Sequence, residues 1–232
     1  MMHLETRGTP VRTPVRVVLA AITWAGVLLQ LVLSLRLAQG NGGSVVDGLV
    51  AYFGYFTVLT NLFVALVLSV PMIAARSSFG RFLSRPGVAA CAAVSILLVG
   101  VGYHVLLRHV WNPQGLQWVA DMVLHYVVPL TFYAFWLLKL SKAGLRWTSP
   151  LWWCVYPLAY FAYALLRGQV LRVYPYYFLD MTVLGFARVL ANASVLLCLF
   201  ALAGVGSIAV ARLLGRLGIG EVANEAGNFT ER

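Results

Sequence analysis

Charged residues are scarce in this chain. They make up 10% of its 232 residues and only seven of them are acidic, whereas 61% of the residues are hydrophobic. Average protein composition includes about 25% charged residues, and the mean hydropathy of +0.85 lies far on the apolar side. The composition therefore excludes a soluble globular protein and predicts an integral membrane protein that works within or at the bilayer.

Cysteine is also sparse, and it does not occur in any motif. Cys91, Cys154 and Cys198 are widely separated, with no CxxC pair and no metal-ligand spacing. Disulfide frameworks and zinc sites depend on such spacings. Internal repeats and low-complexity tracts are missing as well. We therefore expect one undivided bundle, without a metal and without a cofactor.

Long apolar stretches are what the sequence has in abundance. A bilayer core of about 30 Å is crossed by a helix of about 20 apolar residues. Six stretches meet this requirement, with the fifth the shortest: 15–37, 51–75, 87–107, 118–140, 150–166 and 183–210. Their connections are too short for a folded extramembrane domain. We predict an all-α polytopic membrane protein, a six-transmembrane-helix bundle in residues 1–217 followed by a disordered cytoplasmic tail, residues 218–232.

The positive charge is distributed unevenly over the connections. The net charge of +10 comes mainly from residues that precede the first stretch, fill the second and fourth connections, or follow the last stretch: Arg7, Arg12, Arg16, Arg76, Arg81, Arg85, Lys139, Lys142, Arg146, Arg212 and Arg216. These segments share one side of the membrane, and the positive-inside rule assigns that side to the cytoplasm. We predict that both termini are cytoplasmic and that the protein lies in the plasma (cytoplasmic) membrane. The basic excess then reflects topology and anionic lipid, not a nucleic-acid partner.

Three of the stretches each carry one pair of polar residues at i, i+4 spacing. The pairs are Thr57 with Asn61, Asp121 with His125, and Arg188 with Asn192. Polar and ionisable side chains are costly in hydrocarbon, so they usually face the protein interior and indicate a functional site.

The predicted topology brings these pairs to a similar depth. The second, fourth and sixth stretches all run from outside to inside, and Thr57 and His125 each lie about 9 to 10 Å below the outer boundary at 1.5 Å per residue. His104, at the end of the third stretch, and Asp180, in an outer connection, belong to the same leaflet. We expect one polar site in the outer half of the bundle.

A hydrolytic mechanism would use these residue types. The Thr57 hydroxyl is a weak nucleophile unless a base such as His125 removes its proton. Asp121 lies one turn before His125 and is able to orient the imidazole, as the acid of a triad does. Asn61, Arg188 or a tyrosine hydroxyl is a possible donor to the developing oxyanion.

Structural explanations stand beside this one for every group. Thr57, Thr60 and Asn61 are equally compatible with hydrogen bonds between helices, and Arg188 with a side chain that extends to the interface. Asp121 is also suited to a helix start, and His125 to a kink caused by Pro129. A metal site of His104, His125 and Asp121 is a further alternative, although the spacing matches no defined motif.

Several segments together resemble a known family. They are Tyr55–Leu62, Leu124–Leu130, Tyr156–Tyr160 and Tyr174–Asp180. In order and spacing they are similar to a family of bacterial six-helix membrane proteins, which is in turn similar to the animal androgen-induced intramembrane threonine hydrolases. The resemblance implies cleavage of fatty acid esters of hydroxy fatty acids, with Thr57 as nucleophile and His125 as base. The animal motif has an acidic residue where this chain has Thr60, which leaves Thr60 as an alternative nucleophile.

The leading hypothesis is an intramembrane lipid ester hydrolase that takes its substrate laterally from the outer leaflet. Its catalytic residues are Thr57 and His125, and the supporting residues are Asn61, Thr60, Asp121, Arg188, Asn192, His104 and Asp180. The partner is then a lipid of the bilayer. The alternatives are a non-enzymatic protein that binds or transports a lipid or small molecule, and a purely structural bundle. A transporter would more naturally have its site at the midplane between repeats.

Overall fold

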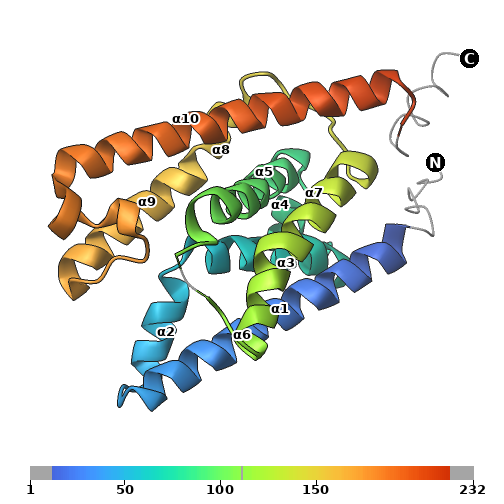
Figure 1. Cartoon of the computed structure of the whole chain (residues 1–232). Coiled ribbons are helices and arrows are strands. Elements are labelled where there is room, and N and C mark those ends of the chain that lie inside the picture. Colours follow the sequence, from blue (N-terminus) through green and yellow to red (C-terminus); the bar gives the residue numbers. More distant parts are fainter. Residues whose placement is uncertain (1–11, 111, 220–232) are drawn as a thin grey trace, which may run out of the picture.

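The computed structural model describes residues 12–110 and 112–219, and within these ranges the chain is helical, without a strand. The described residues form ten α-helices, with three shorter π or 3-10 segments between them, and Figure 1 shows how the helices are arranged. In order they are α1 (Arg12–Gly40), α2 (Val45–Phe53), α3 (Phe56–Ile73), α4 (Ser78–Leu83), α5 (Pro86–Gly102), the π-helix η1 (Tyr103–Leu107), α6 (Leu116–Met122), the π-helix η2 (Val123–Val127), α7 (Val128–Lys139), α8 (Ser149–Trp153), α9 (Val155–Leu171), the 3-10 helix η3 (Tyr177–Leu179) and α10 (Met181–Arg216).

Five segments of the described chain are long and apolar enough to cross a membrane. They are Pro14–Gly40, Phe56–Ile73, Pro86–Leu107, Leu116–Lys139 and Met181–Arg216. A multi-pass membrane protein is therefore the class of molecule that the structure supports. The predicted tail from residue 218 lies outside the described residues from position 220 onward.

The predicted helix 51–75 is divided in two. α2 ends at Phe53, and α3 begins at Phe56 after an extended Tyr55 with φ −94° and ψ 131°. Side chains of α9 occupy carbonyls that a continuous helix would have used: Arg167 donates to the Val50 carbonyl at 3.2 Å, and Tyr160 donates to the Gly54 carbonyl at 3.0 Å. These contacts replace the backbone bonds, so the spanning helix starts about one turn later than predicted.

The predicted helix 150–166 is also interrupted, between α8 and α9. Pro157 has no N–H to offer the Trp153 carbonyl four residues earlier, and the Cys91 thiol approaches that carbonyl instead, at 3.9 Å. Cys154 between the two helices keeps a helical conformation, with φ −57° and ψ −21°. Consequently α9 follows the direction of α8 (Figure 1) and extends to Leu171, beyond the predicted end.

The predicted helix 183–210 is longer, and it is kinked near its start. α10 covers 36 residues, and Gly185 within it has φ 74° and ψ 159°, outside the helical range. Glycine adopts such a positive φ without the steric cost that other residues incur. The kink separates the first turn, capped by Asp180, from the long remainder of the helix.

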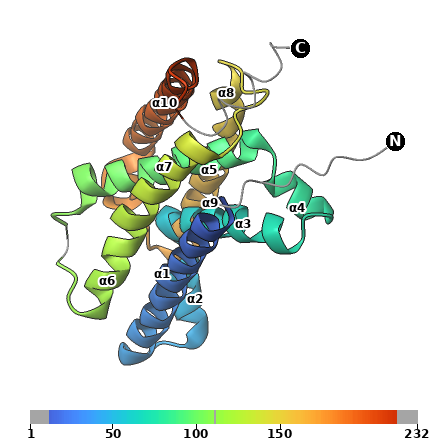
Figure 2. The same ribbon diagram turned by 90° about the vertical axis from the view of Figure 1, so that its right-hand side faces the viewer.

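α5 lies at the centre of the bundle. Its alanines Ala90, Ala92 and Ala93 are fully buried, which allows the neighbouring helices to approach closely. Large side chains fill the space around it, including Phe132, Trp136 and Phe200. α1 and α10 lie on opposite sides of α5 and α7 (Figure 1). α4 projects from the bundle beyond the end of α3 (Figure 2).

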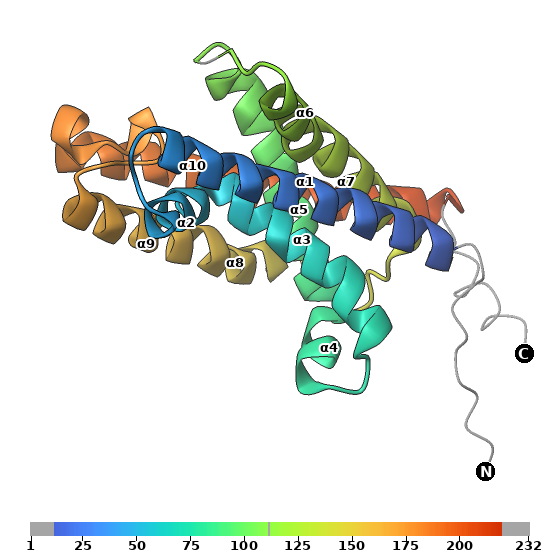
Figure 3. The same ribbon diagram turned by 90° about the horizontal axis from the view of Figure 1, so that it is seen from below.

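The outer surface of the bundle is apolar. Exposed large hydrophobic residues follow the helices along their length, among them Ile73, Leu130, Trp152, Val183 and Leu202. A continuous apolar exterior of this kind is unusual for a soluble monomer and is suited to lipid. The first residues of α1 and the last residues of α10 lie at the same end of the molecule (Figure 3).

Candidate functional site

Thr57 lies in the first turn of α3, and its hydroxyl contacts the imidazole of His125. The Thr57 side chain is buried, with 8% exposed. Its Oγ1 lies 3.3 Å from His125 Nε2. The residues come from separate helices and are 68 positions apart in the chain. The structure therefore brings together the two residues that the sequence suggested as nucleophile and base.

Asp121 fixes the other side of the same imidazole. His125 Nδ1 lies 3.1 Å from the Asp121 backbone oxygen and 3.2 Å from its carboxyl Oδ1. Carbonyl and carboxylate oxygens are acceptors, so we assign the ring proton to Nδ1. Nε2 then has a free lone pair toward Thr57, and the Thr57 hydroxyl donates to it. This is the arrangement in which a histidine acts as a general base.

A π-helical turn and a proline set the position of His125. η2 spans Val123–Val127, and the Val128 N–H bonds to the Val123 carbonyl five residues earlier. In this register Pro129 would pair with the Leu124 carbonyl, but it has no N–H to donate. Such π turns are rare in proteins, and those that do occur are often found at functional sites.

Asn61 satisfies the carbonyl that Pro129 leaves open. Its Nδ2 donates to the Leu124 oxygen at 3.2 Å and to the Thr57 oxygen at 2.9 Å. The side chain is fully buried and joins the turn that carries Thr57 to the turn that carries His125. Both amide hydrogens are used in these bonds, so Asn61 is a positioning residue and not the oxyanion donor that the sequence suggested.

Tyr103 completes a chain of contacts behind His125. Its hydroxyl donates to Asp121 Oδ2 at 2.5 Å. Its ring stacks on the imidazole, with centroids 3.9 Å apart and an interplanar angle of 19°. Asp121 is only 1% exposed, and a buried carboxyl group requires such partners. The contacts therefore run from Thr57 through His125 and Asp121 to Tyr103.

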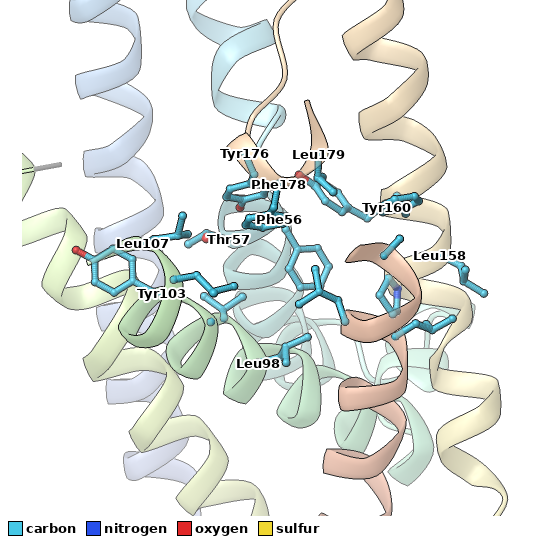
Figure 4. A pocket seen from close by; sticks show the side chains of 18 of the residues that line it. Phe56, Thr57, Leu98, Tyr103, Leu107, Leu158, Tyr160, Tyr176, Phe178 and Leu179 are labelled. Carbon is cyan, nitrogen blue, oxygen red and sulfur yellow. The ribbon is translucent and has the colours of Figure 1, made fainter. Parts of the chain in front are cut away.

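An apolar pocket of about 200 Å³ opens beside Thr57. Figure 4 shows Thr57 at its wall, below Tyr176 and Phe56, with the Tyr103 hydroxyl directed away from it. The walls come from α3, α5 with η1, α9, the segment around η3, and α10: Phe56, Thr57, Leu98, Val99, Gly102, Tyr103, Leu106, Leu107, Pro157, Leu158, Tyr160, Phe161, Tyr176, Phe178, Leu179, Leu190, Ala193, Ser194, Leu196 and Leu197. Leu106, Leu158 and Leu190 are partly exposed at the outside of the bundle. A neutral apolar chain suits this lining.

Thr60 faces a different neighbour from Thr57. Its Oγ1 is hydrogen-bonded to the Tyr156 hydroxyl at 3.1 Å, and the residue is fully buried. The partner of Thr60 is therefore a tyrosine of α9, whereas the partner of Thr57 is His125. Of the two threonines, only Thr57 has an imidazole at hydrogen-bond distance in the described structure.

The third polar pair does not join the site. Asn192 donates to the Phe178 carbonyl at 2.9 Å and so ties α10 to the segment before it. Arg188 is exposed, and the described residues offer it no hydrogen bond or ion pair. Its side chain lies on the other side of α10 from Ala193 and Leu197, which line the pocket. The sequence expectation that Arg188 donates to an oxyanion is not met by this geometry.

Asp180 and His104 also lie apart from Thr57. Asp180 caps α10 by accepting hydrogen bonds from the Thr182 backbone N–H and hydroxyl, and the Thr182 hydroxyl lowers the pKa of that carboxyl group. His104 is exposed and contacts Tyr126 and Arg108, at 3.2 and 2.9 Å. No group of three His, Cys, Asp or Glu side chains within the described residues is arranged to hold a metal.

Two tyrosines of the site were assigned no role from the sequence. Tyr103 was placed in the outer leaflet together with His104, but nothing in its spacing indicated a partner. Tyr176 lies between α9 and α10 and lines the pocket. Burial raises the pKa of its phenol, while hydrogen bonding to the Thr57 side chain and backbone opposes that rise.

Comparisons of the chain with protein-family models, with curated proteins and with solved structures found no match.

Proposed function

We propose that this protein is an intramembrane lipid ester hydrolase with Thr57 as nucleophile and His125 as general base. The observation that carries the proposal is the 3.3 Å contact between Thr57 Oγ1 and His125 Nε2 at the wall of an apolar pocket. The resemblance to the androgen-induced threonine hydrolases supports the same two roles. It also suggests fatty acid esters of hydroxy fatty acids as the substrate class.

The reaction proceeds through an acyl-enzyme. Thr57 Oγ1 attacks the ester carbonyl carbon while its proton passes to His125 Nε2, and Asp121 stabilises the resulting imidazolium. The tetrahedral intermediate collapses, the bond to the alcohol oxygen breaks, and His125 returns the proton to that oxygen. Water then attacks the acyl carbonyl with His125 as base. Thr57 is released together with a carboxylic acid, so one ester and one water give one acid and one alcohol.

The first turn of α3 supplies donors for the oxyanion. The N-cap residue Tyr55 makes no side-chain hydrogen bond to the helix, and the N–H groups of a first helical turn lack partners within the helix. A helix N-terminus favours negative charge. The Tyr176 phenol, whose pKa the Thr57 side chain and backbone lower against the larger effect of burial, is the side chain best situated to assist these N–H groups.

We further propose six membrane crossings with both termini in the cytoplasm of the cell, in the plasma membrane. α8 and α9 together form the fifth crossing in chain order, in addition to the five long apolar segments, since they share one direction and cover Ser149–Leu171. The positive-inside rule supports the same orientation. The substrate then enters from the outer leaflet, past the partly exposed leucines of the pocket.

Activity-based labelling in isolated membranes tests the hydrolase. A fluorophosphonate probe with an alkyl chain is expected to label the wild type and Thr60→Ala, and not Thr57→Ala. His125→Ala should label at least about 100-fold more slowly, the usual contribution of a general base. Thr57→Ser, which keeps a hydroxyl, serves as the conservative control and should retain labelling.

Two results would refute the proposal. One is labelling of Thr57→Ala or His125→Ala at the wild-type rate, with circular dichroism in detergent showing that the variants are folded. The other is a labelled peptide that carries the probe on Thr60. A wild type that takes up no probe but retains lipid through purification would favour a lipid-binding protein, to which the apolar lining is equally suited.

A further inference from the structure

Tyr103 lies at the junction where α5 passes into the π-helix η1. It is the C-cap of α5 and the first residue of η1, and it is buried, with 4% exposed. From this position it reaches α6 and η2 through two different parts of its side chain. The hydroxyl contacts Asp121, and the ring contacts His125.

The hydroxyl determines how the Asp121 carboxyl group is turned. Tyr103 donates to Oδ2, and the second oxygen, Oδ1, then lies 3.2 Å from His125 Nδ1. Rotation of a carboxyl group about its last torsion is weakly restricted by its own chemistry. The phenol therefore supplies the restriction that holds Oδ1 close to Nδ1, in a place where water does not compete. The hydrogen bond of Nδ1 itself goes to the Asp121 backbone oxygen, at 3.1 Å, and Oδ1 has no hydrogen-bond partner among the described residues.

The ring determines how the imidazole is turned. Tyr103 and His125 stack with centroids 3.9 Å apart at 19°. A near-parallel contact at this distance prevents rotation of the imidazole out of its plane, because the rotated imidazole would clash with the tyrosine ring. The plane of the imidazole contains the Nε2 lone pair, so the stacking also directs that lone pair at Thr57 Oγ1.

We propose that Tyr103 is a positioning residue for the Thr57–His125 pair. Its hydroxyl fixes the Asp121 carboxyl group beside Nδ1 and its ring fixes the plane of the imidazole, so that one orientation of His125 prevails, while the Asp121 backbone oxygen accepts from Nδ1. Its effect on reaction rate rests on the proposed hydrolase. Its effect on the state of His125 does not, which allows the two ideas to be tested separately.

Nitrogen NMR of the histidines in detergent micelles is the direct test. The chain has four histidines, and His125→Gln identifies the resonance of interest. In the wild type we expect His125 in a single Nδ1–H tautomer. In Tyr103→Phe the Asp121 backbone oxygen still accepts from Nδ1, so we expect the same tautomer with His125 nitrogen resonances shifted by the released carboxyl group, and the ring-current shift of the imidazole protons should persist. Tyr103→Leu should remove that ring-current shift as well. Tyr133→Phe is the matched control, since it loses a hydroxyl bonded to Ser207 elsewhere in the bundle, and should leave the His125 spectrum unchanged.

Labelling kinetics provide the second measurement. With the fluorophosphonate probe, Tyr103→Phe should reduce the maximal labelling rate about tenfold or more, as expected when reacting groups are slightly misplaced, and leave the half-saturating probe concentration unchanged. A His125 spectrum identical to wild type in Tyr103→Phe overturns the proposal. If the wild type takes up no probe, the hydrolase fails while the spectra still decide the role of Tyr103. If Tyr103→Leu does not fold, the phenylalanine variant, which keeps the ring, decides it alone.

Discussion

Four buried or partly buried side chains of this protein are connected in a sequence of contacts, although one carboxyl oxygen, Asp121 Oδ1, has no hydrogen-bond partner among the described residues. The Thr57 hydroxyl contacts His125, the imidazole contacts Asp121, and the carboxyl group contacts Tyr103. In hydrocarbon an unpaired polar group costs several kcal/mol. The connected arrangement is therefore a condition of placing these residues in a membrane at all, and it also holds the imidazole in a fixed orientation.

Asn61 provides a test of this connection at the level of stability. Asn61→Leu keeps a side chain of similar size but leaves the Leu124 carbonyl without its donor, in a buried place. A buried unsatisfied acceptor costs about 1–3 kcal/mol. We expect thermal unfolding in detergent to show a loss of that size.

The matched control for Asn61 is Asn192→Leu. Asn192 also donates to a carbonyl, that of Phe178, but it is only half-buried, so water is able to replace the lost bond. Its effect on unfolding should be smaller. Equal effects in the two variants would show that the Leu124 carbonyl finds another partner.

Tyr176 provides a test of the proposed oxyanion donor. Tyr176→Phe keeps the ring in the pocket wall and removes the hydroxyl next to Thr57. Loss of one oxyanion donor costs about 100-fold or more in rate when it is the main donor, and we expect at least tenfold here because backbone N–H groups share the task. The maximal rate of probe labelling measures this, and an unchanged rate would assign the oxyanion to the backbone alone.

Residue-level prediction from the sequence succeeded in part. The depth argument put Thr57 and His125 at one level, and the structure brings them into contact. The same argument put Arg188 at that level too, yet Arg188 is exposed, because depth along a helix does not specify which side of the helix a residue faces. The same argument put Tyr103 in the outer leaflet but assigned it no role, since its partners, Asp121 and His125, belong to other helices and local spacing contains no information on such pairs.

At the level of helices, irregular turns carry the residues of interest. Tyr103 begins η1 and His125 lies within η2, both π-helical. A π turn contains one residue more than an α-helical turn. The side chains before and after it therefore lie on different faces of the helix from those that a continuous α-helix would give them. Hydrophobic stretches in the sequence predicted where helices lie. They did not predict these turns or the divisions at Tyr55 and Cys154, because the residues stay apolar on both sides of a break and the pattern does not change there. Pro129 and Pro157 were the only local signals.

Packing between α8 and α10 gives a prediction at this level. A Cβ on Gly204 would lie 2.8 Å from Pro150 Cβ, whereas a Cβ on Gly206 would meet nothing within 4 Å. Overpacking of a filled space typically costs about 1–3 kcal/mol. Gly204→Leu should lower the free energy of unfolding in detergent by that amount, and Gly206→Leu should change it little. Helix propensity favours leucine over glycine at both positions, so equal losses would show that the contact with Pro150 does not decide the difference.

At the level of the whole molecule, the described ends of the chain lie together. The start of α1 and the end of α10 share one end of the bundle (Figure 3). Five crossings would leave the termini on opposite sides of the membrane, and six would leave them on the same side. The count of crossings is therefore open to a simple measurement.

Reporter fusions at the two termini provide that measurement. A reporter that fluoresces only in the cytoplasm should be active at either terminus, because the basic connections favour the cytoplasmic side. A fusion within residues 172–175, between α9 and α10, should be inactive and serves as the control for an outer position. Activity at one terminus only would mean that α8 and α9 do not cross.

The lining of the pocket has a consequence for turnover by the proposed hydrolase. None of its described residues carries a formal charge. Hydrolysis converts a neutral ester into an ionised acid, which such a wall solvates poorly, so the acid should leave toward the membrane surface as it forms. We expect free fatty acid to inhibit labelling far less than the matching fatty alcohol or primary amide when the acid is ionised. Equal inhibition would require a cation near the pocket. If the alcohol and the amide inhibit more strongly than the acid, the scarcity of charge in this chain helps the acid product to leave the pocket.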